Sequence, residues 1–133
     1  MRARSANACG AKVHVIYDAG ADRPIYAAVT SANVNDITAA QDMPIEPGAS
    51  YVFDLGYYDY AWWAKLDAAG CRIVTRFRSS TPLVQPQPRK LPADANPDIL
   101  SDRVGFLPAR QAMSRKNPFQ SPVREIRVRI QTG

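Results

Sequence analysis

Residues 51–77, YVFDLGYYDYAWWAKLDAAGCRIVTRF, determine the local fold around Asp54, the residue on which most of the functional interpretation depends. The apolar run at 51–53 predicts a short strand that ends on Asp54, and Gly56 follows two residues later. A carboxylate at the carboxyl end of a strand lies where α/β sheets usually hold their functional sites. Its oxygens suit hard cations such as Mg²⁺ or Mn²⁺. Asp54 is therefore a candidate metal ligand, and the alternative is an aspartate that only satisfies N–H groups of a turn.

The residues after Asp54 predict a helix over 58–69. One apolar face recurs at helical spacing, and its members are Trp62, Leu66 and Ala69. Asp59 lies where a carboxylate caps free N–H groups, and Gly70 lies where a helix end favours positive φ. We expect Trp62 in the core and Trp63 half-exposed, with stacking on nucleic-acid bases as the functional alternative for both.

Residues 71–77, CRIVTRF, alternate as a strand does. Cys71, Ile73, Thr75 and Phe77 share one face, and Arg72, Val74 and Arg76 share the other. Strand, helix and strand in this order predict an α/β unit.

The chain before Asp54 predicts a hairpin with strands at 12–18 and 25–30, joined by a turn that contains Gly20 and Pro24. A short helical turn then follows Asn35 and Asp36, which are its candidate caps. His14 stands alone in the first strand, so packing or hydrogen bonding is expected of it rather than catalysis.

The chain after residue 81 has a different character. Eight of the 11 prolines lie between Pro82 and Pro122, which excludes a long helix there and predicts an extended, poorly ordered excursion. Residues 99–107 predict one short strand within it. Residues 123–130, VREIRVRI, predict a half-exposed strand, with Ile126, Val128 and Ile130 opposite a charged face that includes Glu125.

Composition limits the class of protein. The 133 residues suit one modest domain, and no apolar run is long enough to span a membrane. Cys9 and Cys71 show no metal-ligand spacing, so we interpret them as reduced thiols of a cytoplasmic protein. Residues 1–70 carry 5 basic and 8 acidic side chains, whereas residues 71–133 carry 12 and 4. A basic second half is expected of a protein that binds a polyanion such as DNA, although a solvated arginine-rich surface explains it equally well.

Residues 51–81 resemble the segment around the second catalytic aspartate of DDE transposases from bacterial insertion sequences, in the IS-four group. The shared pattern is a strand, D-x-G-Y, an aromatic helix that ends in L-x-x-A-G, and a strand that ends in T-R-F. GAKVHVIYD and PIYAAVTSANVNDITAAQ resemble the preceding hairpin and short helix, and VREIRVRI resembles the start of the family's β-rich insertion.

The resemblance implies a ribonuclease-H-like α/β fold. It implies a partial transposase core at residues 1–81, without the first strand, and the start of a Pro-rich, basic β insertion domain at 82–133. The implied reaction is DNA cleavage and strand transfer by two divalent metals held by three carboxylates, and Asp54 matches the second of these. No acidic residue in MRARSANAC matches the first, and Glu125 in a strand pattern does not match the third. We therefore expect a transposase fragment that is inactive alone and binds no metal tightly.

Asp36 and Asp59 are the nearest substitute ligands for an independent metal nuclease, although helix capping explains both better.

Expected DNA contacts are Arg72, Arg76, Arg78, Arg110, Arg115 and Lys116. The partners implied are the DNA ends of an insertion sequence and full-length transposase, with no membrane, at a bacterial nucleoid in the cytoplasm. The competing function is a non-catalytic, inhibitory fragment that binds DNA or full-length transposase.

Loss of the first strand would expose the side chains of Val13, Ile16 and Phe53, so we expect the chain to be marginally stable.

Overall fold

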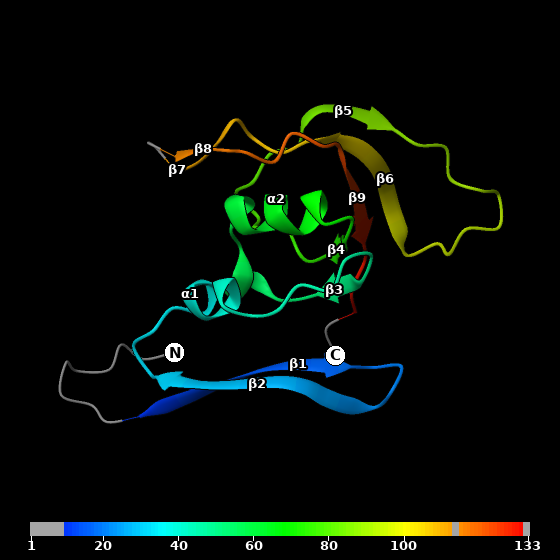
Figure 1. Ribbon diagram of the computed structural model, residues 1–133. Helices are drawn as coiled ribbons and strands as arrows, with labels where there is room; N and C mark the ends of the chain where they lie inside the picture. Colours follow the sequence, from blue (N-terminus) through cyan, green and yellow to red (C-terminus); the bar gives the residue numbers. More distant parts are fainter. Residues whose placement is uncertain (1–9, 113–114, 132–133) are drawn as a thin grey trace.

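The structure is a computed structural model that describes residues 10–112 and 115–131, so Cys9 lies outside the described residues. It is a mixed α/β arrangement of small sheets around a central helix (Figure 1). The elements are β1 (Ala11–Asp18), β2 (Arg23–Ser31), α1 (Asp36–Gln41), β3 (Ser50–Val52), the 3₁₀ turn η1 (Leu55–Tyr57), α2 (Tyr60–Ala68), β4 (Arg72–Val74), β5 (Val84–Pro88), β6 (Ile99–Phe106), β7 (Arg110–Ala112), β8 (Arg115–Lys116) and β9 (Val123–Val128).

The predicted hairpin is confirmed, although Pro24 lies within β2 and not in the turn. β1 and β2 pair antiparallel, and the Asp18 carboxylate closes their turn by accepting hydrogen bonds from the backbone N–H groups of Gly20 and Ala21 at 2.9 and 3.0 Å. Figure 1 shows the hairpin along one side of the molecule. One face turns inward with His14, whereas Val13 and Val29 face each other across the ladder and are 65% and 72% exposed. The hairpin therefore leaves an apolar face open to solvent.

α1 forms where the sequence predicts a short helix, but it is not capped as expected. Asn35 occupies the N-cap position without a side-chain hydrogen bond to the helix, and Asp36 is the first helical residue. The Asp36 carboxylate instead lies 3.4 Å from the ammonium group of Lys12 on β1. A nearby cation thus takes the carboxylate that would otherwise cap the helix.

The predicted strand, helix and strand around Asp54 are confirmed. β3 and β4 pair in parallel, with α2 as the crossover between them. Asp59 caps α2, because its Oδ1 accepts the N–H of Trp62 at 2.9 Å. Gly70 ends the helix at φ +75°, a backbone conformation that side chains disfavour.

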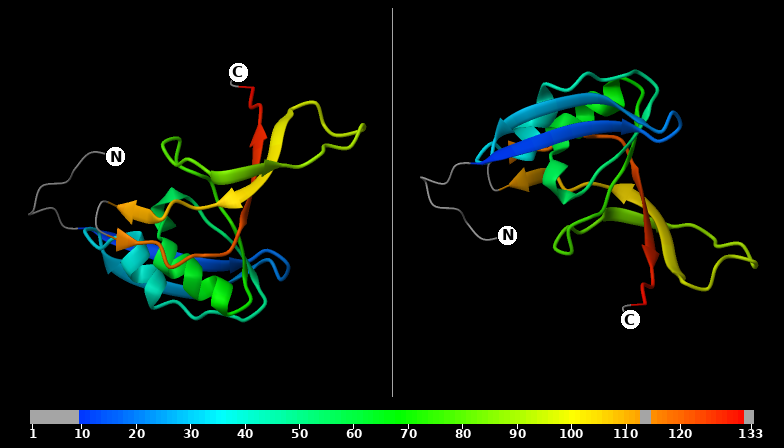
Figure 2. Two further views of the ribbon diagram at one scale, coloured as in Figure 1. Left: turned by 90° about the horizontal axis from the view of Figure 1, so that it is seen from above. Right: turned by 90° about the horizontal axis from the view of Figure 1, so that it is seen from below.

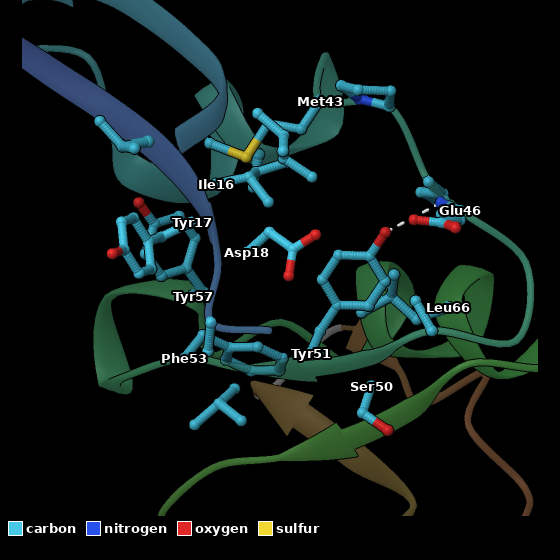
Figure 3. Close-up of a pocket in the computed structure, with 18 of the residues that line it drawn as sticks. Ile16, Tyr17, Asp18, Met43, Glu46, Ser50, Tyr51, Phe53, Tyr57 and Leu66 are labelled. Atoms are coloured by element: carbon cyan, nitrogen blue, oxygen red, sulfur yellow. Dashed lines mark hydrogen bonds between the residues drawn. The ribbon is translucent and has the colours of Figure 1, made fainter. Parts of the chain in front are cut away.

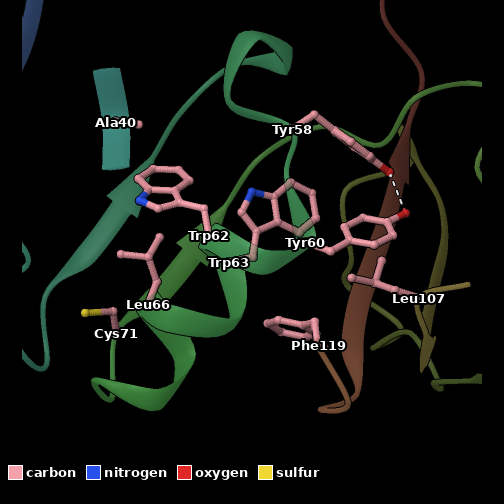
Figure 4. Close-up of a cluster of buried hydrophobic side chains, with 9 residues drawn as sticks. All are labelled: Ala40, Tyr58, Tyr60, Trp62, Trp63, Leu66, Cys71, Leu107 and Phe119. Carbon is pink, nitrogen blue, oxygen red and sulfur yellow. Dashed lines mark hydrogen bonds between the residues drawn. The ribbon is translucent and has the colours of Figure 1, made fainter. Parts of the chain in front are cut away.

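The hydrophobic core forms around α2 and is rich in aromatic residues (Figure 4). Trp62 is buried, as predicted, but Trp63 is only 2% exposed, so its expected half-exposure is wrong. Its indole Nε1 donates to the backbone carbonyl of Tyr57 at 3.0 Å, and Tyr58 packs edge-on against its ring. The buried members are Ala40, Tyr58, Tyr60, Trp62, Trp63, Leu66, Cys71, Leu107 and Phe119.

The proline-rich half is ordered into strands, so the expected poorly ordered excursion is wrong. β5, β6 and β9 form an antiparallel three-stranded sheet that projects to one side of the molecule, and β7 pairs with β8 (Figure 2). The prolines of β5 are tolerated because this strand is at an edge. Leu107 and Phe119 reach the core beside α2, so the two halves of the chain share one core.

The charged and apolar faces of β9 are the reverse of those expected: Glu125 lies on the covered face, and Ile126 and Val128 lie on the exposed one. Glu125 is 8% exposed, whereas Ile126 and Val128 are 47% and 53% exposed. The Glu125 carboxylate accepts hydrogen bonds from Arg103, directly opposite on β6, at 2.5 Å and from Arg127 at 3.1 Å. A paired carboxylate can be buried at far lower cost than a free one, so this ion-pair group occupies the covered face.

No helix in the described part of the chain is long and apolar enough to cross a bilayer.

Candidate metal and nucleic-acid site

Asp54 lies two residues beyond the end of β3 and is exposed to solvent. Its backbone is extended, with φ −93° and ψ −173°, and it is the N-cap residue of η1. Oδ1 accepts the backbone N–H of Gly56 at 2.9 Å. The turn-capping interpretation is thus correct, but it uses one carboxylate oxygen and leaves the other available to a ligand.

Gly56 brings the carboxylates of Asp54 and Asp36 together, although 18 positions separate them in the sequence. A Cβ placed on Gly56 would lie 2.6 Å from Asp36 Oδ2 and 3.1 Å from Asp54 Oδ1. The absence of a side chain at this position therefore allows both acidic groups to approach the same turn. Because Asp36 Oδ1 faces Lys12, its Oδ2 is the oxygen directed at Gly56.

Tyr57 reports the electrostatics of this acidic pair. Partial burial raises the pKa of its hydroxyl, and the carboxylates of Asp36 and Asp54 raise it further by opposing a phenolate. The hydroxyl also shares a hydrogen bond of 3.4 Å with Nδ1 of His14. His14 is 3% exposed, and its Nε2 lies 2.9 Å from the Thr30 hydroxyl. His14 therefore has the packing and hydrogen-bonding role that the sequence predicts.

The carboxylate oxygens around Gly56 are of the type that binds a hard divalent cation, but two carboxylates alone do not complete its coordination. Asp36 and Asp54 offer carboxylate oxygens, which Mg²⁺ and Mn²⁺ prefer, and Mg²⁺ commonly binds through one or two carboxylates while it keeps several waters. Within residues 10–112 and 115–131, no three His, Cys, Asp or Glu side chains are grouped to hold a metal ion. These two aspartates are thus the described residues best placed as ligands.

Asp59, the other candidate substitute ligand, caps α2 and pairs with an arginine. It is 6% exposed and so does not face solvent. Its Oδ1 caps α2 and its Oδ2 lies 3.4 Å from the guanidinium group of Arg115. Both oxygens are therefore occupied by partners from the protein.

The arginines of the β4 segment are presented as the alternation predicts. Arg72, Arg76 and Arg78 are exposed, whereas Ile73 and Thr75 between them are half-buried. Within the described residues, no acidic group lies in ion-pair range of Arg72 or Arg76, so both charges are open to an anion. The guanidinium group of Arg78 lies 4.5 Å from the ring centre of Tyr58, a cation–π arrangement.

The basic residues of the β7–β8 hairpin are a separate group. Arg110 and Lys116 are exposed and directly opposite each other in the ladder. Arg115 is paired with Asp59, although most of its side chain remains exposed.

Sequence reasoning missed Lys12 and Tyr57 as neighbours of the acidic pair. Tyr57 lies within the D-x-G-Y pattern, which gave a local signal. Lys12 gave none, because its approach to Asp36 depends on how the hairpin packs against α1.

Comparison with known proteins decides the family. The model of the transposase DDE domain matches residues 3–127. The chain belongs to the transposase DDE domain family. It is also 40% identical over 82 residues to "Putative transposase y4zB" of Sinorhizobium fredii (strain NBRC 101917 / NGR234). That match covers 62% of this chain and 23% of the relative, so the DDE-domain chain spans about a quarter of that protein. No solved structure matches the chain significantly.

Proposed function

We propose that this chain is part of the catalytic core of a DNA transposase and contributes Asp54 as one metal-binding carboxylate. The observation that carries the proposal is the position of Asp54 in a chain of the DDE family. It is exposed beyond the carboxyl end of β3, and one of its oxygens has no hydrogen-bond partner among the described residues. Asp36 is the neighbouring carboxylate that we add to this site, on the evidence of Gly56.

The proposed reaction is metal-dependent DNA cleavage and strand transfer. Bound Mg²⁺ or Mn²⁺ supplies Lewis-acid stabilisation of charge on phosphate and activates an attacking oxygen. The protein's contribution is to hold carboxylate oxygens at a fixed turn: Asp54 is fastened by the Gly56 N–H, and Asp36 by Lys12. The proposed site is incomplete with these two groups, so the chain acts with carboxylates from elsewhere in a transposase and is inactive alone.

The proposed fold is a partial ribonuclease-H-like core of the IS-four group. In it, the hairpin β1–β2 and the pair β3–β4 belong to one sheet whose first strand is not among the described residues, and residues 82–133 begin a β-rich insertion. The two separate two-stranded sheets and the exposed Val13 support this arrangement. Ile16 and Phe53, which were also expected to be exposed, are half-buried.

The proposed DNA contacts are Arg72 and Arg76, with Arg78, Arg115 and Lys116 as further phosphate contacts. Arginine binds phosphate in bidentate fashion, and each phosphate neutralised adds to the salt dependence of binding. The proposed partner is DNA at insertion-sequence ends, which places the protein at the nucleoid in the cytoplasm.

DNA binding by the purified chain tests this proposal. Fluorescence anisotropy with a labelled duplex, repeated over a series of salt concentrations, gives the slope of log K against log salt. We expect Arg72→Ala and Arg76→Ala each to reduce that slope by about 1, whereas Lys90→Ala, an exposed charge on another part of the surface, is the matched control. A slope that neither arginine changes would contradict the assignment, and no binding at low salt would contradict the DNA partner.

A non-catalytic fragment that binds DNA or full-length transposase is the second candidate. It is favoured by Arg72 on β4 and Arg76 just after it, which have no ion-pair partner among the described residues. It predicts that Asp54→Ala retains full DNA affinity and that the chain inhibits transposition by the full-length enzyme. The catalytic-core proposal predicts that Asp54→Ala removes metal-dependent effects on the same complex.

A further inference from the structure

The ammonium group of Lys12 lies against the proposed carboxylate site. Its Nζ is 3.4 Å from Asp36 Oδ1, and Asp36 Oδ2 is the oxygen directed at Gly56. The same carboxylate therefore faces an internal cation with one oxygen and the candidate metal position with the other. Within the described residues, no other basic side chain lies in ion-pair range of Asp36 or Asp54.

Lys12 is held in this position by more than its ion pair. Its Nζ also donates to the backbone carbonyl of Val34 at 3.0 Å, and its side chain is only 27% exposed. Its backbone belongs to the hairpin ladder, in which Lys12 lies opposite Thr30 of β2. Two anchors that do not depend on Asp36, the Val34 carbonyl and the strand β1, therefore keep the ammonium group beside this carboxylate.

The turn that carries Asp54 is also held in place, by the aromatic residues on either side of it. Phe53 and Tyr57 line the cavity of about 560 Å³ between β1 and β3 (Figure 3), and their rings pack edge-on with centres 6.4 Å apart. The Tyr57 hydroxyl shares a hydrogen bond with His14, which follows Lys12 by two residues on the inward face of β1. Strand β1 therefore contacts both halves of the site, α1 through Lys12 and the Asp54 turn through His14.

The charges at this site act against one another when a metal binds. Two carboxylates at one turn repel each other, and an ammonium group beside one of them offsets part of that repulsion in the metal-free chain. A divalent cation on Asp36 Oδ2 and Asp54 would lie about 5 Å from the same ammonium group, and repulsion at that separation is equivalent to about tenfold in affinity even in water. The positive charge that stabilises the metal-free site thus disfavours the metal-bound one.

We propose that Lys12 is the internal counter-ion of the carboxylate site, which it neutralises in the metal-free chain and whose affinity for a divalent cation it lowers. This inference rests on the proposed function and deepens it, because it names a residue that is not a ligand but sets how tightly the ligands Asp36 and Asp54 bind their cation. An ordinary surface ion pair is the alternative. Such a pair contributes little to stability and would leave the metal affinity unchanged.

Manganese titrations of the full 133-residue chain test this role. Broadening of the Gly56 amide signal as a function of Mn²⁺ concentration gives an apparent dissociation constant for the site. Lys12→Met keeps a long, flexible apolar side chain but removes the charge, so we expect it to bind Mn²⁺ about tenfold more tightly than the native chain does. Lys12→Arg keeps the charge and should stay within about twofold of the native affinity.

Lys90→Met is the matched control for the loss of one positive charge. Lys90 is exposed and lies in the connection from β5 to β6, at the opposite end of the molecule from α1 (Figure 1). Because solvent and salt screen a charge at that distance, Lys90→Met should bind Mn²⁺ within about twofold of the native affinity. Thermal melts followed by circular dichroism establish that each variant is folded.

A second measurement needs no substitution and so retains the test if Lys12→Met does not fold. The native chain is titrated with Mg²⁺, which is diamagnetic, and the side-chain Cε signals of isotope-labelled lysines are followed by NMR. We expect the Lys12 signal to shift with the same dependence on Mg²⁺ concentration as the Gly56 amide signal, and the Lys90 signal to stay unchanged.

Equal manganese affinity in the native chain and in Lys12→Met would overturn the proposal. Weaker binding by Lys12→Met would also overturn it, because Lys12 would then position Asp36 for the metal. A Lys12 signal that Mg²⁺ leaves unchanged while the Gly56 amide signal shifts would have the same consequence. If neither metal affects Gly56 in the native chain or in Lys12→Met, the metal site of the proposed function is itself refuted, and the role of Lys12 with it.

Discussion

Replacing Asp59 separates its structural role from a role as a metal ligand. In Asp59→Ala, α2 loses the cap on the Trp62 N–H, which costs about 1 kcal/mol, with a range of about 0.5–2. The ion pair with Arg115 is also lost, and because most of the Arg115 side chain is exposed it contributes only about 0.2–1 kcal/mol. The free energy of unfolding should therefore fall by about 1–3 kcal/mol.

Urea denaturation followed by tryptophan fluorescence measures this change. Asp59→Asn is the matched variant, since asparagine caps a helix as well as aspartate but carries no charge. We expect Asp59→Asn and Arg115→Ala each to lower the unfolding free energy by less than about 1 kcal/mol, with unchanged slopes against urea.

Equal destabilisation by Asp59→Asn and Asp59→Ala would contradict a capping role for Asp59, because the charge and not the cap would then dominate. Stabilisation of the native chain but not of Asp59→Asn by Mn²⁺ would also contradict it, since Asp59 would then act as a ligand.

Three further predictions concern Gly56 and the nearby tyrosines. Gly56→Ala should change the unfolding free energy by no more than about 1 kcal/mol, because the colliding atom is the end of the Asp36 side chain and can rotate away; loss of more than this in urea would show that the turn is rigid. Asp36→Asn should lower the pKa of Tyr57, because one of the charges that opposes its phenolate is removed; an unchanged pKa by NMR titration would place Asp36 away from it. Burial raises the pKa of the hydroxyl groups of both Tyr57 and Tyr60, so the unfolded chain loses these protons at lower pH than the folded chain does. The contribution of these groups to stability should therefore be complete below about pH 10 and fall as pH rises above it. Tyr60→Phe should weaken that fall, and thermal melts of the two proteins over this pH range that showed no difference would contradict this explanation.

The unit from β3 to β4 was predictable because its signals are local. The helical spacing of Trp62 and Leu66, the cap at Asp59 and the positive φ of Gly70 each depend on neighbours within a few residues. The hairpin was predictable for the same reason, since a turn joins two β-rich runs.

The errors arose where contacts distant in sequence decide the structure. Glu125 is buried because Arg103 on β6 faces it, and nothing within VREIRVRI signals this partner. Asp36 appeared to be a helix cap until the fold brought it beside Lys12 and Gly56. The proline count correctly excluded a long helix but could not show that the edge strand β5 would tolerate its prolines.

The central claim is that Asp54 and Asp36 form a carboxylate pair able to hold a divalent cation. Paramagnetic broadening of backbone amide signals by dilute Mn²⁺ tests it directly, with Asp54→Asn and Asp36→Asn compared against Asp67→Asn, an exposed aspartate on α2, as control. We expect selective broadening around Asp36, Asp54 and Gly56 in the native chain and in Asp67→Asn, and its loss in Asp54→Asn and Asp36→Asn. Broadening centred elsewhere, or unchanged in Asp54→Asn, would contradict it.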